Sequence, residues 1–208
     1  MLKFLNNHKV KFYILTLMVI FFGFSFYGCK TILLKFYGYH QPRIEDKETI
    51  INFAKKKGLI LYNIYCFNEN DWYWAIKEKK IAKDIPEILV FDKSGKLIRY
   101  REDNQCNAKA FSFISSLSTG SKYNIDTLLM FNDLSEKLKD LNGNKVNIQI
   151  KDSIDYYIFI FWTLWTGKLN KDHVKVWEND AINNKNCKIS VYKVNMDLQK
   201  WWENKKIE

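Results

Sequence analysis

The pattern of apolar and polar positions divides the chain into an uninterrupted apolar stretch and a longer region of alternating elements. Residues 12–28 are uncharged and almost wholly apolar, and they follow a short start that carries Lys3, Lys9 and Lys11. Beyond residue 43, short apolar runs typical of buried strands alternate with amphipathic stretches typical of helices. This alternation predicts an α/β fold in which helices flank a mixed sheet.

The first folded segment, residues 44–118, is expected to alternate helices with strands. Glu45 and Asp46 in the first turn and Gly58 at the end indicate the first helix. A turn at 93–96 predicts an antiparallel pair of strands on either side of it. The predicted ranges are 44–58 (helix), 59–67 (strand), 68–82 (helix), 85–92 (strand), 97–101 (strand) and 104–117 (helix).

The second folded segment, residues 144–208, is separated from the first by a linker, residues 119–143. Apolar residues at helical spacing predict an amphipathic helix in the linker, ended by Asn142-Gly143. In the second segment Tyr156–Trp162 is apolar at every position, which is typical of a strand buried on both faces. Further strands are predicted over 146–150 and 187–195, with a helix that begins near 170 and runs through 181.

The N-terminal residues 1–29 have the order of a secretory signal, in which a basic start precedes an apolar run and a small residue. Gly28-Cys29 resembles the lipobox of bacterial lipoproteins, which implies lipidation at Cys29. An uncleaved transmembrane anchor and an ordinary cysteine in a signal remain alternatives. The first two place the protein on a membrane, with residues 30–43 as a tether and the folded part outside the cytoplasm, in the cell envelope or periplasm.

Residues 161–169, Phe-Trp-Thr-Leu-Trp-Thr-Gly-Lys-Leu, resemble the thioredoxin strand that runs through Phe-Trp into Trp-Cys-Gly-Pro-Cys. A strand ending Val-Asn-Met-Asp197 follows at the usual separation. Ile85-Pro86, followed by a strand and a hairpin, resembles the cis-proline loop of the same family, which implies a cis bond before Pro86. The resemblance implies a thioredoxin-like fold with its parts in reversed order. The segment that resembles the N-terminal part of a thioredoxin follows the segment that resembles its C-terminal part. The two pieces either complete one permuted sheet, which we favour, or form two incomplete modules.

The residues in the active-site position depart from the family in chemistry: Trp165, Thr166, Gly167, Lys168 and Leu169 stand where the dithiol motif would be. Dithiol exchange needs one thiolate to attack and a second thiol to resolve the mixed disulfide. Threonine and leucine supply neither. We therefore expect a degenerate site that retains only the scaffold, with free backbone N–H groups over 166–169 able to hold an anion or a backbone carbonyl.

The remaining cysteines and histidines offer little further chemistry. Cys66 is expected in the core, whereas Cys106 near a helix N-terminus is the candidate reactive thiol. Cys187 is the remaining cysteine. No two cysteines have the C-x-x-C spacing of zinc sites or redox sites, so no metal and no cofactor are expected. His40 is expected in a solvated loop and His173 at or near the surface.

The net charge of +10 is spread along the chain, so nucleic acid is not an expected partner. Four tryptophans suggest either a binding patch or core filling: Trp72, Trp74, Trp201 and Trp202. The leading hypothesis is a non-catalytic envelope lipoprotein that acts as a protein-binding or structural module, with another envelope protein as its partner. The alternatives are a thiol-dependent oxidoreductase that uses Cys106, Cys66 or both, and a secreted immunity or interaction factor.

Overall fold

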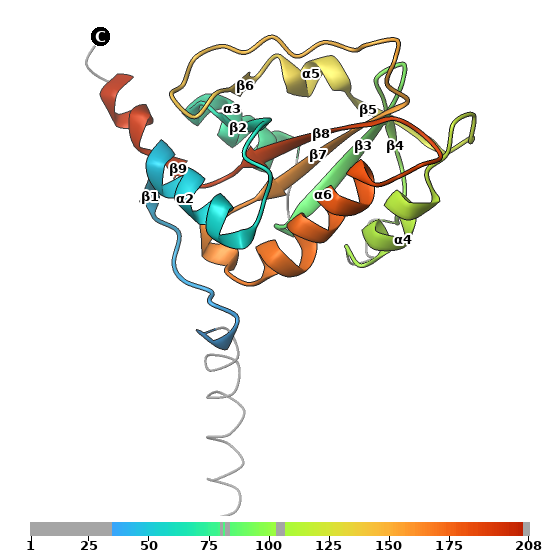
Figure 1. Ribbon diagram of the computed structural model, residues 1–208. Helices are drawn as coiled ribbons and strands as arrows, with labels where there is room; N and C mark the ends of the chain where they lie inside the picture. Colours follow the sequence, from blue (N-terminus) through green and yellow to red (C-terminus); the bar gives the residue numbers. More distant parts are fainter. Residues whose placement is uncertain (1–34, 80, 82–83, 103–106, 206–208) are drawn as a thin grey trace, which may run out of the picture.

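Seven strands form one curled mixed sheet in the computed structural model, which describes residues 35–79, 81, 84–102 and 107–205 (Figure 1). Their order across the sheet is β5-β4-β3-β7-β8-β2-β6. β7 and β2 run parallel to β8, and the remaining neighbours are antiparallel. The strands are β2 (Ile64–Phe67), β3 (Glu87–Asp92), β4 (Lys96–Ile98), β5 (Ile125–Met130), β6 (Leu138–Lys139), β7 (Tyr156–Trp162) and β8 (Ile189–Asn195).

Helices cover both faces of the sheet. α2, α4 and α6 pack on one face, and α3 and α5 lie on the other (Figure 1). Outside the main sheet, β1 (Ile44–Glu45) pairs in parallel with β9 (Leu198–Gln199). The helical elements are α2 (Lys47–Lys57), α3 (Glu69–Tyr73), η2 (Trp74–Glu78), α4 (Lys109–Ser116), η3 (Leu164–Thr166), α5 (Phe131–Ser135), η4 (Asn170–Val174), α6 (Lys175–Ile182) and η5 (Lys200–Lys205).

α2 shows how local sequence fixes an element. The Asp46 carboxylate accepts from the Thr49 N–H at 2.9 Å, which caps the first turn. Gly58 ends the helix at φ 72°, a left-handed conformation that suits glycine. The predicted helix over 44–58 is confirmed except at its start, where Ile44 and Glu45 form β1 instead.

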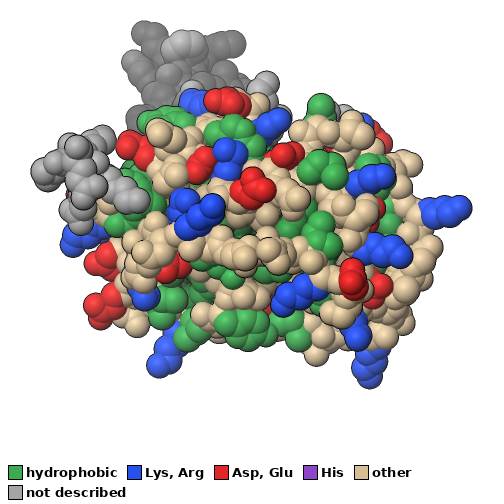
Figure 2. Space-filling view, turned by 90° about the horizontal axis from the view of Figure 1, so that it is seen from above, with side chains coloured by type: hydrophobic (Ala, Val, Ile, Leu, Met, Phe, Trp, Pro, Cys, Tyr) green, Lys and Arg blue, Asp and Glu red, His purple; other side chains and the backbone are tan. Residues whose placement is uncertain are grey.

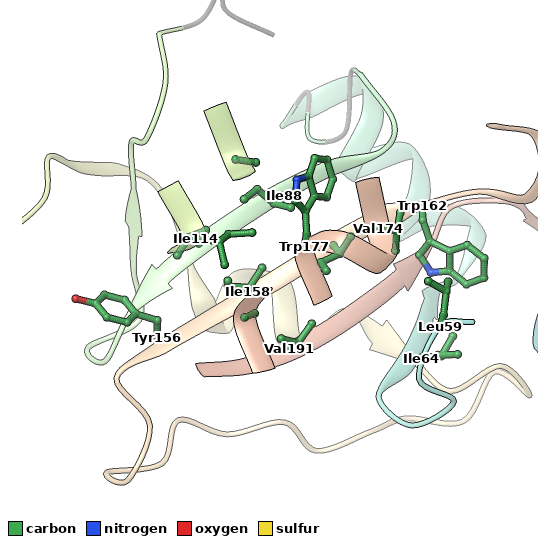
Figure 3. Packing of buried hydrophobic residues seen from close by; sticks show 14 of the residues in the cluster. Leu59, Ile64, Ile88, Ile114, Tyr156, Ile158, Trp162, Val174, Trp177 and Val191 are labelled. Carbon is green, nitrogen blue, oxygen red and sulfur yellow. The ribbon is translucent and has the colours of Figure 1, made fainter. Parts of the chain in front are cut away.

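β7 is the centre of the core, because it is buried on both faces as the sequence predicted. Tyr156, Ile158, Ile160 and Trp162 face the cluster under α2, α4 and α6, where Figure 3 shows Ile158 beside side chains from the helices and from β8. The intervening residues of β7 face the second cluster. This alternation follows from the two-residue period of a strand.

The segments 44–118 and 144–208 share this sheet and its core. β3, from the first segment, pairs with β7 along its length, from Glu87↔Phe161 to Asp92↔Tyr156. β2, also from the first segment, pairs with β8 on the other side. The sheet edges of each segment are therefore covered by strands of the other.

The amphipathic helix predicted within 119–143 is wrong. Residues 125–130 form β5, and only the short α5 and the strand β6 follow. Leu129 is buried while its neighbour Leu128 is 73 % exposed, which is the alternation of a strand. Pairing of Asp126 with Leu97 of β4 overrides the local helical spacing.

Two predicted strands also differ from the structure. Residues 146–150 form no strand; they run as an irregular segment whose apolar side chains pack on the second cluster, and the Tyr157 hydroxyl bonds the backbone of Lys151. The strand expected over 59–67 is shortened to Ile64–Phe67. Before it, Ile60 and Tyr62 bond side chains instead of a neighbouring strand: the Ile60 N–H donates to Glu178 of α6, and the Tyr62 carbonyl accepts from Lys193 of β8.

The surface mixes both charges. On the face seen in Figure 2, Lys and Arg side chains are interspersed with Asp and Glu and with apolar groups. Such mixing is typical of a solvated surface.

Candidate functional site

The turn that follows β7 is held together by buried polar groups. The chain passes from Thr163 through η3 to Gly167. The Thr166 hydroxyl donates to the Thr163 carbonyl at 2.9 Å, and the Asn170 amide donates to the same carbonyl at 2.8 Å. Thr166 and Asn170 are fully buried. The Thr166 hydroxyl therefore stabilises the turn and is closed to a substrate.

The tether expected over 30–43 is described from residue 35, and residues 35–43, called the tether segment below, lie across this turn. The Lys168 N–H donates to the Tyr37 carbonyl at 2.7 Å, and the His40 N–H donates to the Trp165 carbonyl at 3.2 Å. In Figure 1 the tether segment is the blue chain that rises beside the orange turn. The expectation of free N–H groups over 166–169 is thus wrong at Gly167 and Lys168, because the Leu164 and Tyr37 carbonyls accept from these two donors.

Gly167 allows the tether segment to approach this closely. A Cβ atom at Gly167 would lie 2.4 Å from the Tyr37 carbonyl oxygen and 2.5 Å from that of Gly38. Gly167 also has φ 59° and ψ −115°, a conformation that other residues rarely adopt. Beside it, the Lys168 ammonium lies 3.9 Å from the ring centroid of Phe36. Glycine is therefore required for the contact between tether and turn.

Asp197 connects this turn to the end of β8. Its Oδ2 atom accepts from the Leu164 N–H and from the Asn195 amide, both at 2.8 Å. Asp197 is almost fully buried, and burial raises the pKa of its carboxyl to about 6, with the neighbouring Glu45 acting in the same direction. The carboxyl therefore changes protonation near neutral pH. Sequence reasoning noted this strand end but assigned the carboxylate no role.

Pro86 lies where β3 meets the same region. The Ile85–Pro86 bond is cis. Glu87 pairs with Phe161, so Pro86 lies beside the last residue of β7, immediately before the turn. Asn107 donates to the carbonyl oxygen of Pro86. The structure therefore brings Pro86 and the turn at 163–169 together from segments far apart in sequence.

The cysteines that the structure describes are buried. Cys66 is inaccessible, and burial raises the pKa of its thiol to about 12. Cys187 is also buried and free, and burial raises its pKa to about 11. Both values make a thiolate rare at neutral pH. Cys29 and Cys106 lie outside the described residues.

Potential metal ligands and histidines are scattered through the part of the chain that the structure describes. Within it, no group of three His, Cys, Asp or Glu side chains is placed to hold a metal ion. His173 is half-buried between the rings of Phe111 and Trp177, and burial lowers its pKa. His40 is exposed, as expected of a loop residue.

A buried ion pair between Glu178 of α6 and Lys193 of β8 was missed by sequence reasoning. Both side chains are about 1 % exposed. Glu178 also accepts from the Ile60 N–H at 3.0 Å, and Lys193 donates to the Tyr62 carbonyl at 3.1 Å. The signal was a lysine between the apolar residues Tyr192 and Val194 of a buried strand. The pair holds residues 59–63 against the sheet.

No family model, curated protein or solved structure matches this chain. Among the described residues, no helix is both long enough and apolar enough to cross a bilayer. Function is therefore inferred from the site itself.

Proposed function

We propose that this chain is a non-catalytic, membrane-tethered envelope module with a thioredoxin-like fold, in which the former active-site turn binds the protein's own tether. The observation that carries the proposal is the pair of backbone hydrogen bonds joining Tyr37 and His40 to Lys168 and Trp165. A turn already bonded to its own chain and lacking sulfur has no place for a dithiol reaction.

The arrangement of strands supports the thioredoxin-like part of the proposal. The piece that resembles the start of the family contributes β7 and β8, and the piece that resembles its end contributes β3 and β4. In the sheet these four strands are adjacent, in the order β8-β7-β3-β4. This adjacency is what a permuted version of the fold requires, in which the two pieces complete one sheet.

The short stretch of chain between Cys29 and Tyr37 limits how far the docked tether segment can place the folded body from Cys29. Tyr37 is eight residues after Cys29 (37 − 29 = 8), and eight extended residues reach at most about 28 Å. With Cys29 lipidated, docking at Tyr37 holds the folded body close to the membrane surface. The rest of its surface then faces a partner, for which another envelope protein is the proposed class.

The proposed absence of dithiol catalysis is tested with the full-length chain in detergent. The assay measures its reduction of insulin with dithiothreitol as electron donor. We expect no rate above that of dithiothreitol alone. A rate that exceeds this background and disappears when Cys66, Cys106 and Cys187 are replaced by serine would overturn the proposal and favour the alternative oxidoreductase. Buried Cys66, with its raised pKa, argues against that alternative.

The membrane part is tested by palmitate labelling in cells. We expect label in the wild-type protein and none in Cys29→Ser, while Cys66→Ser keeps the label. Absence of label from the wild type, with Met1 still present at its terminus, would replace lipidation by an uncleaved span.

A further inference from the structure

A cleft of about 240 Å³ lies at the carboxyl ends of the parallel strands β2 and β8, apart from the turn after β7. α3, which follows β2, forms one wall, and β9 and η5, which follow β8, form the other. In open α/β sheets, ligands bind outside the carboxyl ends of the strands. The lining residues are Ile44, Glu69, Trp72, Tyr73, Leu198, Gln199, Trp202 and Glu203.

Three aromatic side chains line the cleft and pack edge to face against one another. The rings of Trp72 and Trp202 are 6.2 Å apart at 63°, and Trp72 meets Tyr73 edge to face at 5.3 Å. The Trp72 indole N–H donates to the Met196 carbonyl, and the Trp202 indole N–H donates to the Phe67 carbonyl, each at 3.0 Å. These bonds fix the rings and use up both indole donors. The indole rings therefore present ring surface, and no N–H donor, to the cleft. Aromatic ring surface attracts cations.

The charged side chains among the described lining residues are both acidic. Glu69 and Glu203 line the cleft, and none of the lining residues that the structure describes is Lys or Arg, in a chain of net charge +10. Gln199 is about 1 % exposed, and its amide nitrogen donates to Asn195 and Asp197. Its Oε1 atom has no hydrogen-bond partner among the described residues. A buried acceptor without a partner is costly, and a donor ligand would satisfy it.

We propose that this cleft binds a small organic cation that carries an ammonium group. Aromatic faces, the Glu203 carboxylate and an unpartnered amide oxygen all favour positive charge, and the same lining repels carboxylate or phosphate ligands. A quaternary ammonium uses the rings, whereas a primary ammonium also donates hydrogen bonds to Gln199 Oε1. Both kinds of cation share the chemistry that the cleft recognises.

The test uses full-length protein in dodecyl maltoside, labelled with 5-fluorotryptophan so that its seven tryptophans report by ¹⁹F NMR. Choline supplies the quaternary ammonium and 1,5-diaminopentane the primary one. 3,3-Dimethylbutan-1-ol, the neutral isostere of choline, is the matched control. We expect saturable shifts of the Trp72 and Trp202 signals with at least one cation, at a Kd below about 10 mM, and binding of the neutral alcohol at least about tenfold weaker.

Two variants assign the binding to this cleft. Trp202→Leu removes a ring and is expected to weaken cation binding about tenfold. Glu203→Gln, at an exposed position where folding is not at risk, is expected to weaken it about threefold, while Glu48→Gln on α2 leaves it unchanged. The proposal is overturned if neither cation binds, if choline and its isostere bind equally, or if Glu203→Gln and Glu48→Gln behave alike. None of these outcomes bears on the turn after β7, so the proposed function is judged separately.

Discussion

Replacing Gly167 by alanine tests the contact between the tether segment and the turn directly. The added methyl group would lie 2.4–2.6 Å from backbone atoms of Tyr37 and Gly38, which cannot rotate away as a flexible side chain would. The tether segment must therefore move. Its movement breaks the hydrogen bonds that join Lys168 to Tyr37 and His40 to Trp165.

The expected loss of stability in Gly167→Ala has two contributions. Alanine at φ 59° and ψ −115° costs about 1–3 kcal/mol of backbone strain. Each lost hydrogen bond costs about 1 kcal/mol. The free energy of unfolding should therefore fall by about 3–5 kcal/mol.

Gly120→Ala is the matched control. Gly120 also has a positive φ, of 82°, but a Cβ atom added there would have no other atom within 4 Å. This variant reports the cost of the backbone conformation, about 1 kcal/mol, without displacing anything. The difference between the two variants, about 2–4 kcal/mol, measures mainly the loss of the tether contact, and the backbone strain of alanine at ψ −115° supplies the rest.

Guanidinium unfolding followed by circular dichroism measures the global effect, and amide hydrogen exchange measures the local one. In Gly167→Ala the Lys168 and His40 amides should lose their protection, while the amides of β7 keep theirs. In Gly120→Ala all of these amides should stay protected. Equal stabilities of the two variants, with the Lys168 amide still protected in Gly167→Ala, would refute the docking of the tether on the turn.

Three further predictions concern buried ionisable groups. Glu178→Gln leaves the Lys193 ammonium buried without its carboxylate, so urea unfolding should show a loss of about 3–5 kcal/mol; a loss under about 1 kcal/mol would contradict this role. Because the pKa of Asp197 is raised from 3.8 to about 6 on folding, the folded state binds more protons between pH 4 and 6, and this carboxyl lowers stability as pH rises through that window. Asp197→Asn should remove that slope from the stability measured between about pH 4 and 7, and an unchanged slope would assign it to another group. In a Cys29→Ser, Cys106→Ser background, Cys66 and Cys187 should react with a thiol reagent at neutral pH only after denaturant is added, because burial raises both pKa values; rapid reaction of the native protein would show that they are accessible.

The sequence by itself determined the elements whose signals are local. Seven successive apolar residues specified β7, and an acidic cap with a terminal glycine specified α2, because burial on both faces and helix capping depend on neighbours within a few positions. The sequence also determined which chemistry the turn after β7 lacks. The absence of sulfur at Thr166 and Leu169 excludes dithiol exchange at this turn whatever the fold.

Only the tertiary structure decided which segments meet. The helical spacing at 125–130 was overridden by pairing with β4, and strand pairing across more than sixty residues joined β3 to β7. The docking of Tyr37 on Lys168, the pair Glu178–Lys193 and the aromatic cleft likewise join residues remote in sequence. Such contacts depend on the packing of the whole core, and no local pattern of residues encodes them.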